Sequence, residues 1–228
     1  MGGIWLRGLN WCRRFRHRCG YGVHSPSDFF LITFVIYEQA PYYAFASLHH
    51  LRRVVSHLPH YREKVDRFLF RLANYLQPVN IVEVGTGSGL TTRYIAEACP
   101  KSSVLTISDM REESVERIFS SQSNITYLSG NAVDKMEQVL STAKAPLDLI
   151  HVADIPDYRE VVEKILPFVH ERTCLVVANP YGSEEKKRWW KEVLLADQLV
   201  RVTFDLYDVG LVFFDKKRAK ENHIVNFL

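Results

Sequence analysis

The sequence predicts a Rossmann-like α/β fold, in which a mostly parallel sheet of seven strands has helices on both faces and ends in an antiparallel hairpin. Three observations predict it. Strand-like and helix-like segments alternate from residue 79 onward, a glycine-rich loop follows the first strand, and the last two strands leave no room for a helix between them. Such alternation indicates βαβ units, which place parallel strands side by side beneath helices.

Five strand-like segments rich in β-branched and apolar residues are each followed by a segment of helical length. The strands are expected at 79–84, 103–108, 124–128, 147–153 and 172–178. The helices are expected at 90–99, 111–121, 132–142, 157–168 and 183–196. The stretch LVRVTFDLYDVGLVFFDKK then predicts two strands joined by a short turn near Asp208 and Gly210, which makes them a hairpin.

The region before the sheet is predicted to be helical. Ser25 suits the N-cap of one helix, Pro26 suits its first position, and Asp28 favours the positive end of its dipole. A second helix is expected over YREKVDRFLFRLANYLQP, whose apolar residues share one face. We therefore expect a basic arm and helical cap over residues 1–78 and a ligand-binding domain over residues 79–228.

Composition indicates an ordinary globular protein, with 228 residues of which 47% are hydrophobic and 24% charged. Four scattered cysteines without a CxxC pair support neither a disulfide framework nor a zinc site. No apolar run approaches the roughly 20 residues of a membrane span. The N-terminal arginines follow the short apolar patch instead of preceding it, which argues against a signal peptide. We therefore expect a cytoplasmic protein.

The net charge of +3 is unevenly distributed, because residues 1–25 hold five arginines and no acid, whereas residues 26–228 hold 24 basic and 26 acidic residues. Helical spacing relates Arg7, Asn10, Arg14 and His17, which predicts a basic amphipathic helix. Residues 1–19 could then contact a membrane surface weakly or bind phosphates of a nucleic acid. Alternatively, they form a solvated arm that packs its tryptophans on the body of the protein.

The segment IVEVGTGSGLTTRYI, residues 81–95, predicts a ligand-binding loop at the end of a strand. Its glycines stand at every second position: Gly85, Gly87 and Gly89. Glycine lets the backbone approach a ligand, and ligands bind at the carboxyl ends of strands in such sheets. A Walker A loop is excluded because no lysine occurs between Asn80 and Pro100. A dinucleotide fingerprint is disfavoured because Leu90 occupies its third glycine position.

The remaining pattern is E-x-G-x-G-x-G, with Glu83 two residues before Gly85. It resembles motif I of the class I S-adenosylmethionine (SAM) methyltransferases, whose sheet also ends in a hairpin. The segments GYGVHSP, Tyr42-Tyr43 and LYDVGLVFFDKKRAKENHIVNF are similar to an uncharacterised bacterial group of these enzymes, which is related to the catechol and caffeoyl-CoA O-methyltransferases. The resemblance extends from about residue 16 onward and implies SAM as the cofactor and a small-molecule acceptor.

The resemblance also implies which residues hold the cofactor. The acid Glu83 would orient the ammonium group of SAM, while the glycine loop wraps its methionine end. That loop comprises Gly85, Thr86, Gly87, Ser88 and Gly89. Members of the family usually end the second strand with an acid that binds the ribose, and this chain has Ser108 followed by Asp109. Asp109 either replaces that acid or begins the next helix, and Asn131 and Ala132 are expected beside the adenine.

The chain departs from the catechol-type pattern where those enzymes hold Mg²⁺. Its residues there are Ala153, Asp154, Ala178 and Asn179. One carboxylate and one amide make a poor Mg²⁺ site, because this ion prefers carboxylates and waters in octahedral geometry. We therefore expect no metal. The sulfonium already activates the methyl group, so the protein mainly aligns the acceptor with the donor, and a base removes the proton of a hydroxyl acceptor.

The candidate catalytic residues are Asp154, Asn179 and Tyr181, at the ends of two strands. For Asp154, a role as a turn acid before Pro156 stays open. His151 alternates with apolar residues inside a strand and is interpreted as a packed or hydrogen-bonded histidine. The acceptor side is also expected to include residues of the cap, namely His24, Tyr42 and Tyr43.

Three functions stay open, and a SAM-dependent methyltransferase acting on a small molecule without a metal is the first of them. A degenerate, non-catalytic relative is the second, since Ser108, Ala153 and Ala178 replace expected ligand-facing acids. A nucleic-acid methyltransferase is the third; the near-neutral body and the single proline of NPY at 179–181 argue against it. The helix containing KKRWWK is expected to have a solvated basic face, and a homodimer also stays open.

Overall fold

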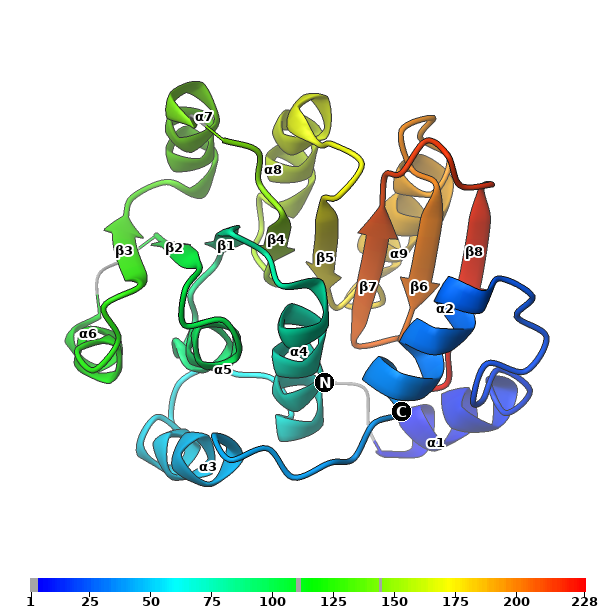
Figure 1. The fold of residues 1–228 in the computed structure, drawn as a ribbon, viewed down its shortest axis with the longest axis horizontal. Helices are drawn as coiled ribbons and strands as arrows, with labels where there is room; N and C mark the ends of the chain where they lie inside the picture. Colours follow the sequence, from blue (N-terminus) through cyan, green and yellow to red (C-terminus); the bar gives the residue numbers. More distant parts are fainter. Residues whose placement is uncertain (1–3, 110–111, 144) are drawn as a thin grey trace.

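The protein forms one mixed sheet in the computed structural model, which describes residues 4–109, 112–143 and 145–228. The strands are β1 (Asn80–Val84), β2 (Ser103–Ser108), β3 (Ile125–Ser129), β4 (Leu149–Val152), β5 (Cys174–Ala178), β6 (Val202–Asp205), β7 (Val209–Phe213) and β8 (Glu221–Ile224). Their order is β3-β2-β1-β4-β5-β7-β6-β8 (Figure 1). The first five strands are parallel, and β7 runs antiparallel to both β5 and β6, as predicted.

Helices cover both faces of this sheet. They are α1 (Ile4–Arg13), α2 (Pro26–Leu31) with a π-helical continuation η1 (Ile32–Ile36), α3 (Phe45–Val54), α4 (Glu63–Leu76), α5 (Leu90–Ala98), α6 (Glu113–Phe119), α7 (Ala132–Thr142), α8 (Tyr158–Ile165) with a 3-10 turn η2 (Leu166–Phe168), and α9 (Glu184–Arg188) with a π-helical continuation η3 (Trp189–Leu194). Helices α3, α4 and α5 lie on one side of the row of strands, and α7 and α8 on the other (Figure 1). Successive strand residues accordingly alternate between two cores, with Ile81 in one and Val82 in the other.

The helical cap follows the predicted signals in part. The backbone N–H of Asp28 donates to the Ser25 side chain at the start of α2, and α4 buries its apolar face against the sheet. The sequence does not predict α3, because Phe45 and Leu48 are its only two buried residues and most of the others are polar. The boundary at residue 79 between a cap and a ligand-binding domain stays a prediction.

The sheet has eight strands instead of the predicted seven. The additional strand, β8, pairs in parallel with β6 at the edge and alternates between half-buried and exposed residues, so it lacks an apolar pattern. A buried carboxylate holds it in place. Asp28 of α2 accepts hydrogen bonds from the Arg218 guanidinium and from Nε2 of His223, the latter at 3.2 Å. The strand therefore depends on a tertiary ion pair, which local sequence does not reveal.

Stability should consequently depend on the ionisation of Asp28. Burial raises the pKa of this carboxyl, but hydrogen bonds from His223 and Arg218 outweigh it and hold the pKa below its ordinary value of 3.8. A carboxylate with a lowered folded-state pKa stabilises the protein above its unfolded-state pKa, and this stabilisation is lost as the pH falls through the folded-state value. We predict that Asp28→Asn lowers the free energy of unfolding by about 3 kcal/mol at neutral pH.

Urea unfolding at neutral pH and below about pH 3 measures this effect, and the difference between the two proteins should shrink at the lower pH. Glu184→Gln is the control, because the Glu184 side chain is 83% exposed beside Lys187; it should change the free energy by less than about 0.5 kcal/mol. An equal loss for Asp28→Asn at both pH values would contradict the ionic role.

Candidate functional site

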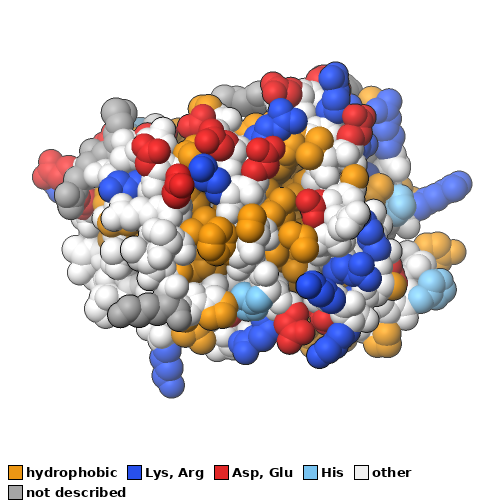
Figure 2. Space-filling model, turned by 90° about the horizontal axis from the view of Figure 1, so that it is seen from above, with side chains coloured by type: hydrophobic (Ala, Val, Ile, Leu, Met, Phe, Trp, Pro, Cys, Tyr) orange, Lys and Arg blue, Asp and Glu red, His pale blue; other side chains and the backbone are white. Residues whose placement is uncertain are grey.

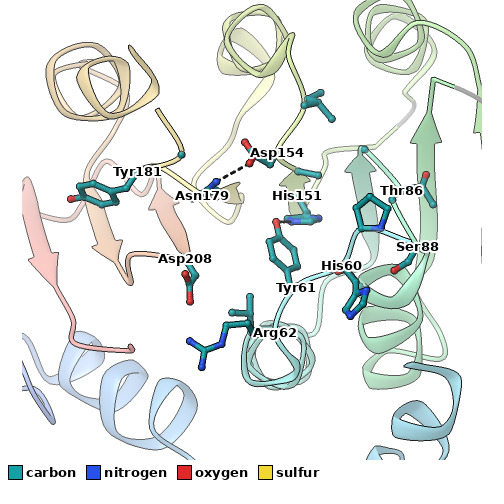
Figure 3. A pocket seen from close by; sticks show the side chains of 18 of the residues that line it. His60, Tyr61, Arg62, Thr86, Ser88, His151, Asp154, Asn179, Tyr181 and Asp208 are labelled. Carbon is teal, nitrogen blue, oxygen red and sulfur yellow. Dashed lines mark hydrogen bonds between the residues drawn. The ribbon is translucent and has the colours of Figure 1, made fainter. Parts of the chain in front are cut away.

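A cavity of about 1060 Å³ opens at the carboxyl ends of β1, β4 and β5. It lies beside the boundary between β1 and β4, where the strand order reverses and where ligands bind in open α/β sheets. Its wall consists of the glycine loop, the segments after β4 and β5, residues 59–62 before α4, the turn between β6 and β7, and Arg7 of α1 (Figure 3). A smaller cavity of about 220 Å³ adjoins the glycine loop at the end of β2.

The glycine loop takes a course that only glycine allows at Gly85. The φ angle there is +97°, and a Cβ atom would lie 2.7 Å from both the Ala153 Cβ and the Ile155 Cγ2. The Ser88 N–H donates to the Pro59 carbonyl at 3.1 Å, which joins the loop to the segment before α4. The loop is therefore fixed between two strand ends, with its backbone lining both cavities.

Glu83 lies beneath the loop and does not line either cavity. It is almost fully buried, and it accepts hydrogen bonds from the hydroxyls of Thr106, at 2.8 Å, and Thr92. Its other oxygen lies 3.0 Å from Nδ1 of His151, whose Nε2 lies 3.0 Å from the Tyr61 hydroxyl. The hydrogen-bonded interpretation of His151 is thus confirmed. Glu83 contacts protein groups here, whereas the resemblance implied direct contact with a ligand ammonium group.

Asp154 and Asn179, both predicted site residues, meet at the cavity wall. The Asn179 amide donates to one Asp154 oxygen at 2.8 Å, and the Lys186 ammonium donates to the other at 2.7 Å (Figure 3 draws the first of these). The expectation of a solvated basic face is wrong for Lys186, which is buried with its ammonium 4.5 Å from the Tyr158 ring centre. Burial lowers the pKa of Lys186, and contact with Asp154 opposes this only in part.

The N-terminal helix packs against the body through its arginines. Arg7 binds Asp208 with two hydrogen bonds of 2.7 Å, and Arg14 binds the Asp205 carboxylate at 2.9 Å. The alternative in which the arm packs its tryptophans is not supported at Trp11, which is 37% exposed. The physical reason is that the turn between β6 and β7 presents two carboxylates that only cations can neutralise.

Tyr181, the third predicted catalytic residue, stacks on Tyr207 with ring centres 5.1 Å apart. The Arg14 guanidinium lies 5.2 Å and 5.3 Å from the two ring centres. The Tyr181 hydroxyl donates to Asp205, and burial together with this carboxylate raises the pKa of the phenol. The phenolic proton of Tyr181 is therefore engaged in the hydrogen bond to Asp205. The aromatic stack of Tyr181 and Tyr207 forms a flank of the cavity.

The smaller cavity contains the residues expected at the ribose and adenine: Ser108, Asp109 and Ala132. Asp109 does not begin the next helix, since α6 starts at Glu113; the predicted start at 111 lies outside the described residues. Asn131 does not line either cavity, and its side-chain oxygen caps α7 by accepting from two backbone N–H groups at 2.9 Å and 3.1 Å.

Several residues of the wall were not predicted. The expected acceptor-side residues His24, Tyr42 and Tyr43 do not line either cavity, because Tyr42 packs on the aromatic rings of the cap and Tyr43 is exposed. Tyr61 lines the cavity instead of these residues. The sequence does not predict it, because it lies in a polar stretch without a motif. The helical spacing of Arg7 and Arg14 is the signal in the sequence that could have placed Arg7 at the wall, because both arginines bind carboxylates at the β6–β7 turn.

Known proteins with this fold include methyltransferases. No protein-family model matches the chain. It is 29% identical to a catechol O-methyltransferase from Niastella koreensis over 121 residues, which span 50% of this chain and 54% of that protein, so the match covers about half of each. The O-methyltransferase TomG from Streptomyces achromogenes, involved in tomaymycin synthesis and solved with SAM, superimposes with a TM-score of 0.62 at 21% identity over 79% of this chain and 93% of its own.

An O-methyltransferase from Bacillus cereus, solved in complex with S-adenosylhomocysteine (SAH), gives a TM-score of 0.63 at 18% identity over 83% of this chain and 97% of its own. At these identities the likeness shows the fold. The predicted class of fold, with its C-terminal hairpin, is thereby confirmed.

The geometry at Gly85 yields a stability prediction. Gly85→Ala should lower the free energy of unfolding by about 2 kcal/mol, because the added Cβ is strained at positive φ and meets two side chains. Gly8→Ala in α1, where nothing lies within 4 Å of the added Cβ, is the matched control; it should leave stability equal or slightly higher. Equal urea midpoints for the two variants would show that the loop tolerates a side chain.

Proposed function

We propose that this chain is a SAM-dependent methyltransferase that methylates a small-molecule acceptor without a metal ion. The observation that carries the proposal is the pair of adjoining cavities on either side of a positive-φ glycine loop, at the point where the strand order reverses. One cavity suits the adenosine part of the cofactor. The other has room for its methionine part and an acceptor together.

The lining of the two cavities fits SAM. A Cβ at Gly85 would lie 2.7 Å from side chains of the segment after β4, so glycine lets the loop pack closely against that segment beside the cavity. Described residues of the loop carry hydroxyls and no cations, which suits a cofactor without phosphate. Ser108, Asp109 and Ala132 would hold the adenosine part, and Thr86 and Ser88 the methionine part. When bound, SAM supplies a methyl group activated by its sulfonium.

Lys186 provides the argument for metal independence. Its ammonium binds Asp154 at the position where the resemblance implies Mg²⁺ in catechol-type enzymes, and Asn179 occupies the second Asp154 oxygen. The buried ammonium does not line the cavity itself, but it supplies positive charge to Asp154, the carboxylate that does. We infer that Lys186, Asp154 and Asn179 together orient the acceptor.

The remaining wall indicates the kind of acceptor. The stack of Tyr181 and Tyr207 offers an aromatic flank, and Arg7 of the arm closes that side together with Asp208. Arg62 also lines the cavity, and its guanidinium has no ion-pair or hydrogen-bond partner in the described part of the chain. A small aromatic acceptor with an acidic substituent would satisfy both features.

The ion pairs of Arg7 and Arg14 favour a role for the arm in the acceptor site over binding to a nucleic acid or to a membrane surface. Arg7 and Arg14 already bind carboxylates, which makes them poorer partners for nucleic-acid phosphates. Acidic and basic side chains are intermixed on the face shown in Figure 2, with hydrophobic ones between them. Among the described residues, no helix has the length and apolar character to cross a bilayer. A homodimer and weak contact of residues 1–19 with a membrane surface stay predictions.

Cofactor binding is the first prediction of the proposed function. Titration calorimetry should detect SAH binding in the micromolar range, and Gly87→Arg should weaken it by at least about 100-fold, because the new side chain enters the cavity. Gly22→Arg is the matched control, since Gly22 also has a positive φ and nothing lies within 4 Å of an added Cβ. Retention of full affinity by Gly87→Arg would place the cofactor elsewhere. Binding without turnover on any acceptor would favour the non-catalytic alternative.

Metal independence is the second prediction of the proposed function. Methyl transfer should continue unchanged in EDTA, and Lys186→Met should lower kcat/KM by at least about tenfold, which corresponds to about 1.4 kcal/mol of transition-state stabilisation. Lys187→Met is the control, because Lys187 pairs with the exposed Glu184 at the surface, whereas Lys186 binds Asp154 of the cavity wall. Loss of activity in EDTA that Mg²⁺ restores would contradict the role of the ammonium.

A further inference from the structure

A chain of three hydrogen-bonded side chains leads from the cavity into the core. Tyr61 lines the cavity, and its hydroxyl points toward the imidazole of His151, as Figure 3 shows. The two groups are 3.0 Å apart, and the opposite nitrogen of His151 lies 3.0 Å from the carboxylate of Glu83. His151 and Glu83 are each 1% exposed. The pair is thus shielded from solvent, while Tyr61 in front of it is partly buried and lines the cavity.

The contacts of Glu83 determine where the protons lie. Its carboxylate accepts hydrogen bonds from the hydroxyls of Thr92 and Thr106, which is the behaviour of an ionised group. An ionised carboxylate can only accept, so Nδ1 of His151 carries a proton and donates it to Glu83. In the neutral imidazole, Nε2 then has a free lone pair. That lone pair accepts the hydrogen bond of the Tyr61 hydroxyl.

We propose, on the premise of the methyltransferase function above, that Tyr61 is a catalytic residue that takes the proton of the acceptor hydroxyl and passes its own proton to His151. As the bond between the acceptor oxygen and the methyl carbon forms, the bond between that carbon and sulfur breaks. The acceptor proton moves to the Tyr61 oxygen, and the phenolic proton of Tyr61 moves to Nε2. The products are the methyl ether, neutral SAH and an imidazolium beside the Glu83 carboxylate.

The surrounding charges suit this transfer. Burial, followed by the carboxylates of Asp66, Glu83, Asp154 and Asp208, raises the pKa of Tyr61 well above its ordinary range, so the side chain remains a neutral phenol. A neutral phenol can accept one proton while it donates another. The Glu83 carboxylate lies 3.0 Å from Nδ1 of His151, beside the imidazolium that the transfer would form.

The Asp154 carboxylate, which also lines the cavity, is already engaged with the protein. Both oxygens of Asp154 already accept hydrogen bonds, one from the buried Lys186 ammonium and one from Asn179. Asp154 is thus held in place by two donors, and its oxygens are engaged with the protein. The structure thus assigns orientation of the acceptor to Asp154 and removal of its proton to Tyr61.

Two acceptors that differ in acidity test the proposal with Tyr61→Phe, which removes one oxygen atom. Catechol is a neutral phenol at neutral pH and needs a base, whereas 4-nitrocatechol is largely ionised there and does not. The variant should lower kcat/KM for catechol by about 100-fold or more and change it for 4-nitrocatechol by less than about threefold. Tyr75→Phe, at a partly exposed position on α4 that does not line the cavity, should leave both values unchanged.

The possible outcomes separate the proposal from its premise. An equal loss for both acceptors, with SAH affinity retained, overturns the role of Tyr61 in proton transfer and leaves the methyltransferase function intact. Failure of the wild type to bind SAH overturns both. Independently of any acceptor, ¹⁵N NMR of the His151 imidazole at neutral pH should show a protonated Nδ1 and an unprotonated Nε2. A protonated Nε2 would overturn the transfer, since it could not receive a proton.

Discussion

The buried carboxylate of Glu83 is the constraint on which the arrangement of the cavity depends. An ionised group removed from water costs several kcal/mol unless protein groups replace its hydration. Here Thr92 of α5, Thr106 of β2 and His151 of β4 supply those groups to a carboxylate on β1. Satisfying one charge therefore fixes three strand ends and a helix relative to one another. The hydrogen bond from His151 to Tyr61 extends the same network to the segment before α4, which forms part of the cavity wall.

Cations that the sequence suggests are solvated form ion pairs with carboxylates of the cavity wall in this protein. Arg7 binds Asp208 and completes the wall on the acceptor side, and the Lys186 ammonium lies on Asp154 beneath it. Each cation neutralises a carboxylate that lines the cavity. The basic arm and the lysine-rich helix thus contribute to a site for a small molecule.

The sequence predicts those parts of the molecule that depend on local pattern. The five βα units, the hairpin and the glycine loop were all expected, because apolar periodicity and glycine at positive φ act within a few residues. β8 was not expected, since its partner Asp28 lies almost two hundred residues away in the chain. Tyr61 and Lys186 were missed for a related reason. Their roles depend on burial and on the nearest charge, which are properties of the packed structure.

The central claim is that one cavity at the end of β1 and β4 holds SAM beside an acceptor site built from protein cations. A crystal structure of the protein grown with SAH and Mg²⁺ tests it most directly. The account predicts the adenine beside Ser108 and Ala132, the sulfur facing the Tyr61 hydroxyl, and the Lys186 ammonium still on Asp154. Electron density for a metal ion at Asp154 with Lys186 displaced, or SAH bound away from the glycine loop, would contradict it.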